Sequence, residues 1–317
     1  MILLWLIEAL AGAAEPIASR IVHGDDGLAA HLISEGSLRE RIAPPDDAEW
    51  VLFYTGEQRG DLAPCGCATR PRGGLPRTAS IVEASQPNLF VNVGGWLDGG
   101  TGLDGNPIPE AELKNQWMIK GLSALNPAAV HVGFEDLPAL GTMDGAAGGL
   151  PLVSANLRGP GIEPAVYAEH NGLTFAFIGV SHRGHASIQT PLYERLDPTR
   201  AGMDALSAIP ESVDRIVLFN HGAYDAAKRL AKTGRIDAVI DTRKHRSLDA
   251  PFRVGKAVWI RSHEQGLRLG ELRVGPSGVV DRKIDLDDRV PDHQTLRAIA
   301  DEADAEVKAL RDRLFGP

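Results

Sequence analysis

Residues 51–80 read VLFYTGEQRGDLAPCGCATRPRGGLPRTAS, and this stretch decides the fold. The apolar run at its start, residues 51–54, predicts a buried strand. A polar turn follows from Thr55 to Gly60, and the Gly73–Gly74 pair marks the start of a helix. A strand, a loop and a helix in this order form the first unit of an α/β sheet, in which loops at the carboxyl ends of strands carry the chemistry.

The composition indicates a globular protein. With 317 residues, 43% of them hydrophobic, the chain can bury a sizeable core in one large α/β domain or two small ones. A formal net charge of −9 and the lack of a basic run argue against nucleic acid or an anionic membrane surface as the main partner. We therefore expect a small molecule or a protein as the partner.

The amino terminus, MILLWLIEALAGAAEP at residues 1–16, is typical of a secretory signal, because an apolar core precedes a small-residue stretch. The run is too short to span a bilayer of roughly 30 Å. Glu8 and the missing basic segment leave a short amino-terminal helix as the alternative. We expect export, for example to the periplasm, without a transmembrane span; a cytoplasmic location is the alternative.

The rest of the chain is predicted to hold a linker at residues 17–48, a folded domain at 49–290 and a carboxyl-terminal helix at 291–317. Apolar runs predict further strands at residues 89–93, 129–132, 150–155, 173–180, 214–219, 236–240, 258–261 and 266–274. The last two of these are expected to be antiparallel. Helical spacing predicts helices at residues 114–125, 223–233 and 296–314, the last with Asp292 as its N-cap.

The string YTGEQRGDLAPCGC, followed by GGLPRTASIVEA, resembles the opening of one branch of the calcineurin-like metallophosphoesterases. This branch contains the 5'-nucleotidases and UDP-sugar hydrolases. The resemblance covers residues 49–285 and implies the amino-terminal catalytic domain of that family. It implies an α/β fold, with a metallophosphoesterase-like two-layered β-sandwich core flanked by helices, plus the long carboxyl-terminal helix.

In the family, about seven side chains hold two metal ions roughly 3.5 to 4 Å apart. The resemblance places the first two ligands, an Asp and a His, at Glu57 and Arg59. It places the bridging Asp at Gly95, which has no side chain to bridge with. Asp98 is a conceivable substitute there, but a solvated turn is the favoured interpretation.

The remaining motifs are also altered in part. The Gly-Asn-His-Glu motif corresponds to residues 133–136, which read Gly-Phe-Glu-Asp. Of this motif's Asn, His and Glu, only the acidic residue survives. A ligand His after a strand is matched by His221. The Gly-His-x-His motif places Arg243 at its first His and His245 at its second. The resemblance thus leaves Glu57, His221 and His245 as residual metal ligands.

Two arginines fall on ligand positions, and this suggests a cleft that binds an anion in place of metal. Arg59 and Arg243 could pair with carboxylates or with a bound anion, or both could be surface residues. A Gly-Gly pair at a helix start offers free amides to an anion. The predicted anion or cleft residues are Arg59, Arg243, Gly73, Gly74, Glu135 and Asp241.

Cys65 and Cys67 are the only cysteines. As thiolates they could supply two ligands to one metal ion or change redox state, and a purely structural turn is the alternative. His182 and His185 have a spacing that suits metal, but solvated histidines are the favoured interpretation. Asn156 is expected to serve packing or a loop cap.

Three functional hypotheses follow. The first is an exported, non-hydrolytic binding or accessory protein with a degenerate dinuclear site, whose partner is a small anion, a phosphorylated ligand or a protein. The second is a phosphoesterase with one divalent metal ion at Glu57, His221 and His245. The third is a thiol or metal-handling protein acting through Cys65 and Cys67. In the first, no cofactor is expected at full occupancy.

Overall fold

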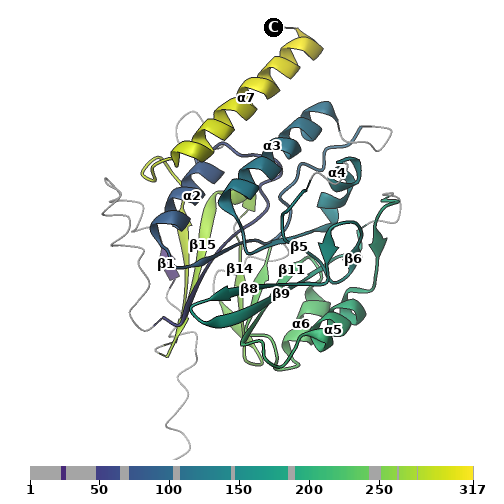
Figure 1. Cartoon of the computed structure of the whole chain (residues 1–317), viewed down its shortest axis with the longest axis vertical. Coiled ribbons are helices and arrows are strands. Elements are labelled where there is room, and N and C mark those ends of the chain that lie inside the picture. Colours follow the sequence, from purple (N-terminus) through teal and green to yellow (C-terminus); the bar gives the residue numbers. More distant parts are fainter. Residues whose placement is uncertain are drawn as a thin grey trace, which may run out of the picture.

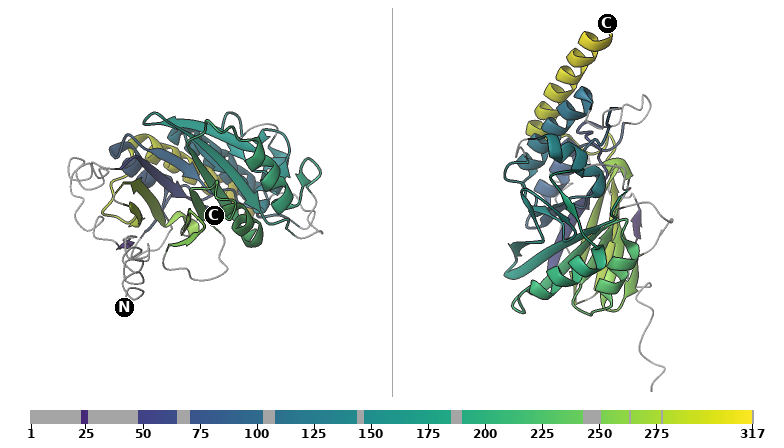
Figure 2. Two further views of the ribbon diagram at one scale, coloured as in Figure 1. Left: turned by 90° about the horizontal axis from the view of Figure 1, so that it is seen from below. Right: turned by 90° about the vertical axis from the view of Figure 1, so that its right-hand side faces the viewer.

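The computed structural model describes residues 23–25, 48–64, 71–102, 108–143, 147–184, 190–242, 251–262, 264–276 and 278–316. Over these residues two large sheets lie face to face, with helices on both outer sides (Figures 1 and 2). The architecture confirms the predicted two-layered β-sandwich core flanked by helices.

The first sheet has eight strands within the described residues. In spatial order they are β1 (His23–Asp25), β16 (Gly278–Asp285), β15 (Arg268–Gly275), β2 (Trp50–Thr55), β3 (Leu89–Asn92), β4 (Ala129–His131), β5 (Leu152–Val153) and β7 (Ile162–Glu163). The strands from β2 to β7 run parallel to one another. Every residue of β2 is buried, as expected for a parallel strand covered on both faces.

The second sheet has six strands in the described part of the chain. In spatial order they are β13 (Phe252–Val254), β14 (Ala257–Arg261), β12 (Ala238–Asp241), β11 (Arg215–His221), β9 (Leu173–Ser181) and β8 (Ala165–His170). β9, β11, β12 and β14 are parallel, and the hairpin from β8 to β9 turns at Asn171 and Gly172, which both have positive φ. A short ladder joins β6 (Leu157–Arg158) to β10 (Glu194–Arg195).

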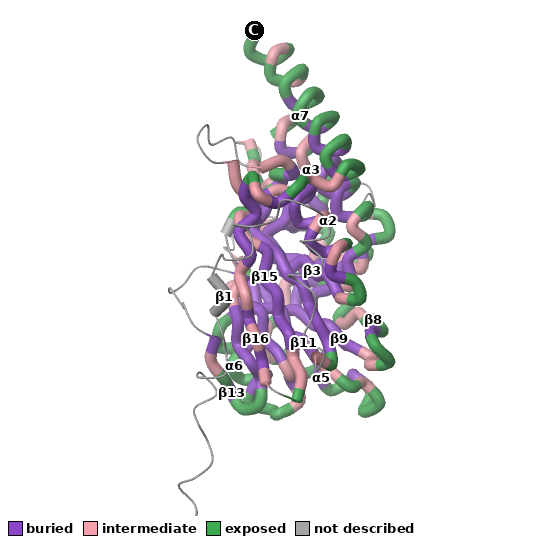
Figure 3. The backbone as a smooth tube through the Cα atoms, turned by 90° about the vertical axis from the view of Figure 1, so that its left-hand side faces the viewer, coloured by how far each residue is buried: buried purple, intermediate pink, exposed green. Residues whose placement is uncertain are grey.

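Three hydrophobic clusters hold the layers together. Trp50, Leu52 and Tyr54 of the first sheet meet Phe177 and Phe219 of the second in the central cluster. Figure 3 shows β3, β9, β11 and β15 largely buried, whereas much of α7 is exposed. The sandwich therefore forms because alternate residues of β2 face the other sheet and the rest face the helices.

The helices form the two outer layers (Figure 1). On the first sheet lie α2 (Leu75–Ala84), α3 (Pro109–Leu125), η3 (Phe134–Asp136), α4 (Leu137–Thr142) and α7 (Gln294–Phe315); on the second lie α5 (Pro198–Ala208) and α6 (Tyr224–Ala231). A short 3-10 segment, η4 (Glu264–Gly266), precedes β15. None of the described helices combines the length and the apolar composition that a membrane span requires.

Several expectations need correction. β14 and β15 lie in different sheets, so they do not form the expected antiparallel pair. α7 is capped by His293, whose side chain accepts from the N–H of Leu296, and not by Asp292. α5 was not predicted, although Asp197 caps it and Pro198 opens it. The described residues 23–25 of the predicted linker form β1.

The topology brings the carboxyl ends of the parallel strands of both sheets to one edge. The loops after β2, β3 and β4 of the first sheet meet the ends of β9 and β11 of the second there, through contacts such as that between Glu57 and His221. This edge holds the candidate site.

Candidate functional site

The loop after β2 turns sharply and is pinned to the loop after β3. Glu57 and Arg59 have φ values of 59° and 53°, in the left-handed region that non-glycine residues rarely adopt. The N–H of Glu57 donates to Gly94 O (2.9 Å), and the N–H of Arg59 donates to Gly95 O (3.1 Å). This backbone costs about 1–3 kcal/mol per residue and is held by its surroundings.

The Glu57 carboxylate receives two cationic or potentially cationic partners. Arg59 Nη2 donates to Oε2 at 3.0 Å, and His221 Nε2 donates to Oε1 at 2.8 Å. Burial raises the pKa of Glu57, but the hydrogen bonds and charges of His221 and Arg59 outweigh burial and lower it overall. The expectation that Arg59 pairs with a carboxylate is therefore met at Glu57.

Glu57 also fills the space next to Gly95. A Cβ atom on Gly95 would lie 2.8 Å from Glu57 Oε1, and its φ of +68° is itself unfavourable for a side chain. No side chain fits at position 95 while Glu57 holds this position. The residues present therefore do not fit a metal pair that needs a bridging carboxylate at position 95.

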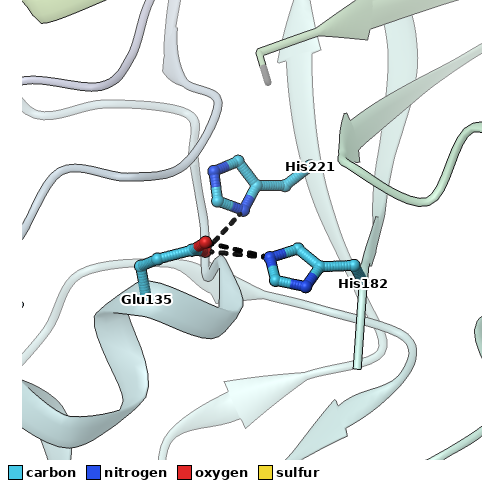
Figure 4. A group of neighbouring side chains, drawn as sticks. All are labelled: Glu135, His182 and His221. Carbon is cyan, nitrogen blue, oxygen red and sulfur yellow. Dashed lines mark hydrogen bonds and ion pairs between the residues drawn. The ribbon is translucent and has the colours of Figure 1, made fainter. Parts of the chain in front are cut away.

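Three side chains from separate segments converge beside this loop (Figure 4). Glu135 lies on η3, His182 follows β9, and His221 ends β11. His182 Nε2 lies 3.0 Å from Glu135 Oε1, and His221 Nδ1 lies 3.3 Å from Glu135 Oε2. One donor atom from each residue lies within 4.8 Å of the other two, which is a spacing that one metal ion could bridge.

His221 is the centre of this group. Burial lowers its pKa, but the hydrogen bond with Glu57 and the charges of Glu135, Glu57 and Asp136 outweigh burial and raise the pKa overall. The imidazole thus lies between two carboxylates, with Glu57 at Nε2 and Glu135 at Nδ1. Its side chain is only 2% exposed, while that of Glu135 is 40% exposed, so the group opens to solvent on the Glu135 side.

Asp136 supports the site from behind. Its carboxylate accepts from the N–H groups of Gly95 (3.1 Å), Leu97 (3.0 Å) and Gly133 (2.8 Å), and it therefore joins the loops after β3 and β4. Burial raises the pKa of Asp136 to about 7, although these three N–H groups act in the opposite direction. We assign it a structural part in the site.

His131, which was not singled out from the sequence, lies fully buried in β4. Its Nδ1 pairs with Val153 O at 2.9 Å, while its Nε2 is buried without a hydrogen-bond partner among the described residues. Its ring centre lies 6.4 Å from that of His221. Burial lowers the pKa of His131 to about 3, so the ring is neutral at ordinary pH.

Another predicted cleft residue, Asp241, lies near the same edge. Asp241 ends β12, is buried, accepts from Asn220 Nδ2 at 2.9 Å and lies 3.7 Å from Arg261 Nη2. Burial raises its pKa. Phe134, at the family's Asn position, is buried and its ring packs 5.3 Å from the His182 ring.

The glycine pair opens α2 as expected. The N–H of Gly73 donates to Leu286 O at 2.7 Å, and Gly74 precedes the first helical residue with a φ of 96°. The neighbouring Arg77 turns inward and donates to Pro71 O and Leu286 O. The N–H of Gly73 is therefore already used in a hydrogen bond within the chain. Anion binding at this helix start stays a prediction.

Some predicted residues take structural places. Asp98 accepts from the N–H of Gly100 at 2.9 Å, which fits the favoured turn interpretation. Asn156 exchanges hydrogen bonds with the backbone of Ser181, as expected for a packing residue. Cys65, Cys67, His185, Arg243 and His245 lie outside the described residues.

His182 was expected to be solvated, and this was wrong. Its side chain is 22% exposed and contacts Glu135. A sequence signal existed: His182 and His221 each follow or end an apolar strand, and β9 and β11 pair in parallel with Ser181 opposite His221. The carboxyl ends of adjacent parallel strands meet at one edge, so residues there become neighbours.

Comparison with known proteins supports the fold. No protein-family model matches the sequence, and no curated protein matches it. Among solved structures, the sulfate thiohydrolase SoxB of Thermus thermophilus, in complex with glycerol, aligns with a TM-score of 0.64 at 14% identity over 84% of this chain. The fold is that of the 5'-nucleotidase-like metallophosphoesterases.

Two further structures share this metallophosphoesterase fold. The NAD nucleotidase NadN of Haemophilus influenzae aligns with a TM-score of 0.61 at 14% identity, and covers 84% of this chain. A putative 5'-nucleotidase of Staphylococcus aureus, in complex with alpha-ketoglutarate, aligns with a TM-score of 0.58 at 12% identity over 80% of this chain. This chain spans 62%, 60% and 58% of the three structures, SoxB first.

Proposed function

We propose that this chain is a non-hydrolytic binding or accessory protein built on the metallophosphoesterase fold. The observation that carries the proposal is the position of the Glu57 carboxylate beside Gly95. The Glu57 carboxylate takes the space that a bridging side chain at position 95 would need. Two-metal hydrolysis requires a bridging nucleophile between two firmly held ions. Among the described residues, one group of donor atoms, from Glu135, His182 and His221, could hold an ion.

The charges of the cleft support the same proposal. Arg59 and His221 both contact Glu57, and Glu135 lies on the other side of His221. Cationic and anionic side chains thus stabilise each other around Glu57. The Arg59 side chain is 64% exposed, and its guanidinium has five N–H donors, so a small anion or a phosphorylated molecule is the ligand class we favour at the rim.

Hydrolysis assays on the full purified chain test this proposal. The substrates are p-nitrophenyl phosphate, bis-p-nitrophenyl phosphate and AMP, each with Mn²⁺, Zn²⁺ or Mg²⁺. We expect no turnover above buffer and metal alone, and we expect Arg59→His to leave this result unchanged because position 95 still lacks a carboxylate. A dinuclear phosphoesterase run in the same buffers shows that the assay works.

Metal-dependent turnover by the wild type, lost in His221→Ala and kept in the surface control Glu169→Gln, would overturn the proposal. So would two firmly bound ions per chain in elemental analysis. Export remains part of the proposal and rests on residues 1–16; the mature amino terminus of secreted material would test it.

A second candidate is a phosphoesterase with one metal ion. The convergence of donor atoms from Glu135, His182 and His221 favours it. This group differs from the predicted ligand set of Glu57, His221 and His245, but both contain His221. The same assay decides between the two candidates, because only this one predicts turnover that depends on Glu135 and His221 together.

A further inference from the structure

The side chains of Glu135, His182 and His221 offer two imidazoles and one carboxylate to a common point. Their donor atoms lie within 4.8 Å of one another, and they come from η3, the end of β9 and the end of β11 (Figure 4). Two histidines and one carboxylate, with further positions open to water, form a donor set used for Zn²⁺ and for Fe²⁺.

The tautomer of His221 prepares one nitrogen of this set for an ion. Nε2 donates to Glu57 Oε1 at 2.8 Å, so the proton of the neutral ring lies on Nε2 and the lone pair lies on Nδ1. Nδ1 is buried, makes no hydrogen bond among the described residues, and faces Glu135 Oε2 at 3.3 Å. A metal-binding histidine usually donates its other N–H to a carboxylate in this way.

In His182, the proton of the neutral ring lies on the nitrogen that faces Glu135. Its Nδ1 accepts from the N–H of Gly184 at 3.0 Å, so the neutral ring carries its proton on Nε2, which lies 3.0 Å and 3.2 Å from the two Glu135 oxygens. An ion at Nε2 requires the other tautomer, in which the proton has moved to Nδ1 and Nδ1 no longer accepts from Gly184. The turn at Gly184 must then adjust, so His182 contributes less to affinity than the other two ligands.

We propose that Glu135, His182 and His221 Nδ1 bind a single divalent transition-metal ion, and that Glu57 positions His221 by holding its Nε2–H. The site lies on the Nδ1 side of His221, so it leaves the ion pair between Glu57 and Arg59 intact. Imidazole donors favour Zn²⁺ and Co²⁺ over Mg²⁺ and Ca²⁺. The inference stands independently of whether the cleft hydrolyses phosphoesters.

Titration calorimetry with Zn²⁺ and absorption spectroscopy with Co²⁺ on the chelator-treated full chain test the site. We expect one equivalent of Zn²⁺ and visible Co²⁺ bands that Zn²⁺ removes. Glu135→Gln and His221→Ala should each weaken Zn²⁺ binding by about 100-fold or more. Each removes a direct ligand, and the loss of an outer-shell partner alone costs about 10- to 100-fold. His182→Ala should weaken it by a smaller factor.

The Glu57→Gln variant separates a positioning residue from a ligand. It should keep one equivalent and weaken affinity by roughly 10- to 100-fold, with the Co²⁺ bands shifted but present. Glu169→Gln, an exposed glutamate on β8, and the double variant Cys65→Ser with Cys67→Ser should bind as the wild type does. Circular dichroism and thermal melting in chelator confirm that each variant is folded.

Three outcomes would overturn the proposal: wild type that binds no Zn²⁺ stoichiometrically, Glu135→Gln that binds as the wild type does, or binding lost in the cysteine double variant. If His221→Ala fails to fold, Glu135→Gln and the Co²⁺ spectrum still decide, because Glu135 is partly exposed. Hydrolysis measured in parallel reports on the non-hydrolytic proposal alone, so the failure of one is distinguishable from the failure of the other.

Discussion

Glu57 and Gly95 form a reciprocal pair at the residue scale. The longer arm of a glutamate places its carboxylate where a side chain at position 95 would begin, 2.8 Å from the would-be Cβ atom. Each residue therefore constrains the other: a side chain at position 95 requires Glu57 to move, and Glu57 in this place requires glycine. A single reversion at either position does not rebuild the family's bridging geometry.

His131 predicts a particular dependence of stability on pH. Its folded pKa of about 3 lies below the ordinary value of 6.5, so the unfolded state binds more protons between these limits. The contribution of the neutral ring is complete above pH 6.5 and is lost as pH falls toward 3. Between pH 6.5 and 4.5 the loss is on the order of 2 kcal/mol, since one pKa unit corresponds to about 1.36 kcal/mol.

Urea unfolding of wild type and His131→Gln across this range measures the effect. The free energy of unfolding of the variant should fall less steeply with acid than that of the wild type. His131→Asn serves as the matched comparison, because the two variants can differ in absolute stability and still share the shallower slope. Parallel curves for wild type and both variants would contradict the burial of a neutral ring.

Individual site residues were predictable to different degrees. Glu57 lies in the loop after β2 and His221 ends β11, and the sequence resemblance placed both in the cleft. Glu135 was predicted as a cleft residue, but its contact with His182 was not, because that contact depends on which strands pair. The inward turn of Arg77 was also unpredictable, since it depends on the carbonyl of Leu286, more than 200 residues away.

At the element scale, Arg77 fixes the start of α2 to the connection before α7. Its side chain is 8% exposed, donates to Pro71 O at 2.8 Å and Leu286 O at 3.0 Å, and lies 3.4 Å from Asp292. Arg77→Met removes both hydrogen bonds and the contact with Asp292, although Leu286 O keeps the N–H of Gly73 as a donor. We expect the free energy of unfolding to drop by about 2–3 kcal/mol, the range for a charged hydrogen-bonding group.

Chemical denaturation of Arg77→Met checks this value. Arg313→Met is the control, because the Arg313 side chain is exposed and donates only weakly, at 3.4 Å, to Ala309 O in its own helix. The control should remain within about 0.5 kcal/mol of the wild type. Equal stability of the two variants would show that Arg77 does not hold these segments together.

Elements with a strong local pattern were predicted well, and those that depend on tertiary context were not. β2, β3, β9 and β11 are continuous apolar runs and lie close to the expected bounds. α3 begins at Pro109, five residues before the expected start, because a proline at the first helical position extends it through a less apolar segment. β14 and β15 were paired wrongly because periodicity reports a strand without its partner.

At the scale of the whole molecule, α7 is only partly integrated into the layers. Its buried residues end at Val307, and the rest of the helix projects past the body (Figure 1). Beyond that point its described contacts to other elements include the exposed ion pair between Arg311 and Glu110. Removing residues 309–317 should therefore lower the free energy of unfolding by less than about 1 kcal/mol.

Thermal and urea unfolding of the shortened chain test this expectation. Leu296→Ala is the contrast, because Leu296 is 2% exposed in the cluster beneath α7 and its truncation should cost about 2–5 kcal/mol. A loss of several kcal/mol on removing residues 309–317 would show that the projecting end supports the fold.

The left-handed backbone at Glu57 and Arg59 has a consequence for laboratory evolution. Glycine adopts such φ values without steric cost, so glycine at position 59 would relieve strain in the loop. A library sorted for heat resistance alone should drift toward glycine there, while one sorted for anion binding at the cleft should retain arginine. The difference in glycine frequency at position 59 between the two libraries would show how strongly ligand binding by the side chain outweighs the backbone strain of the loop.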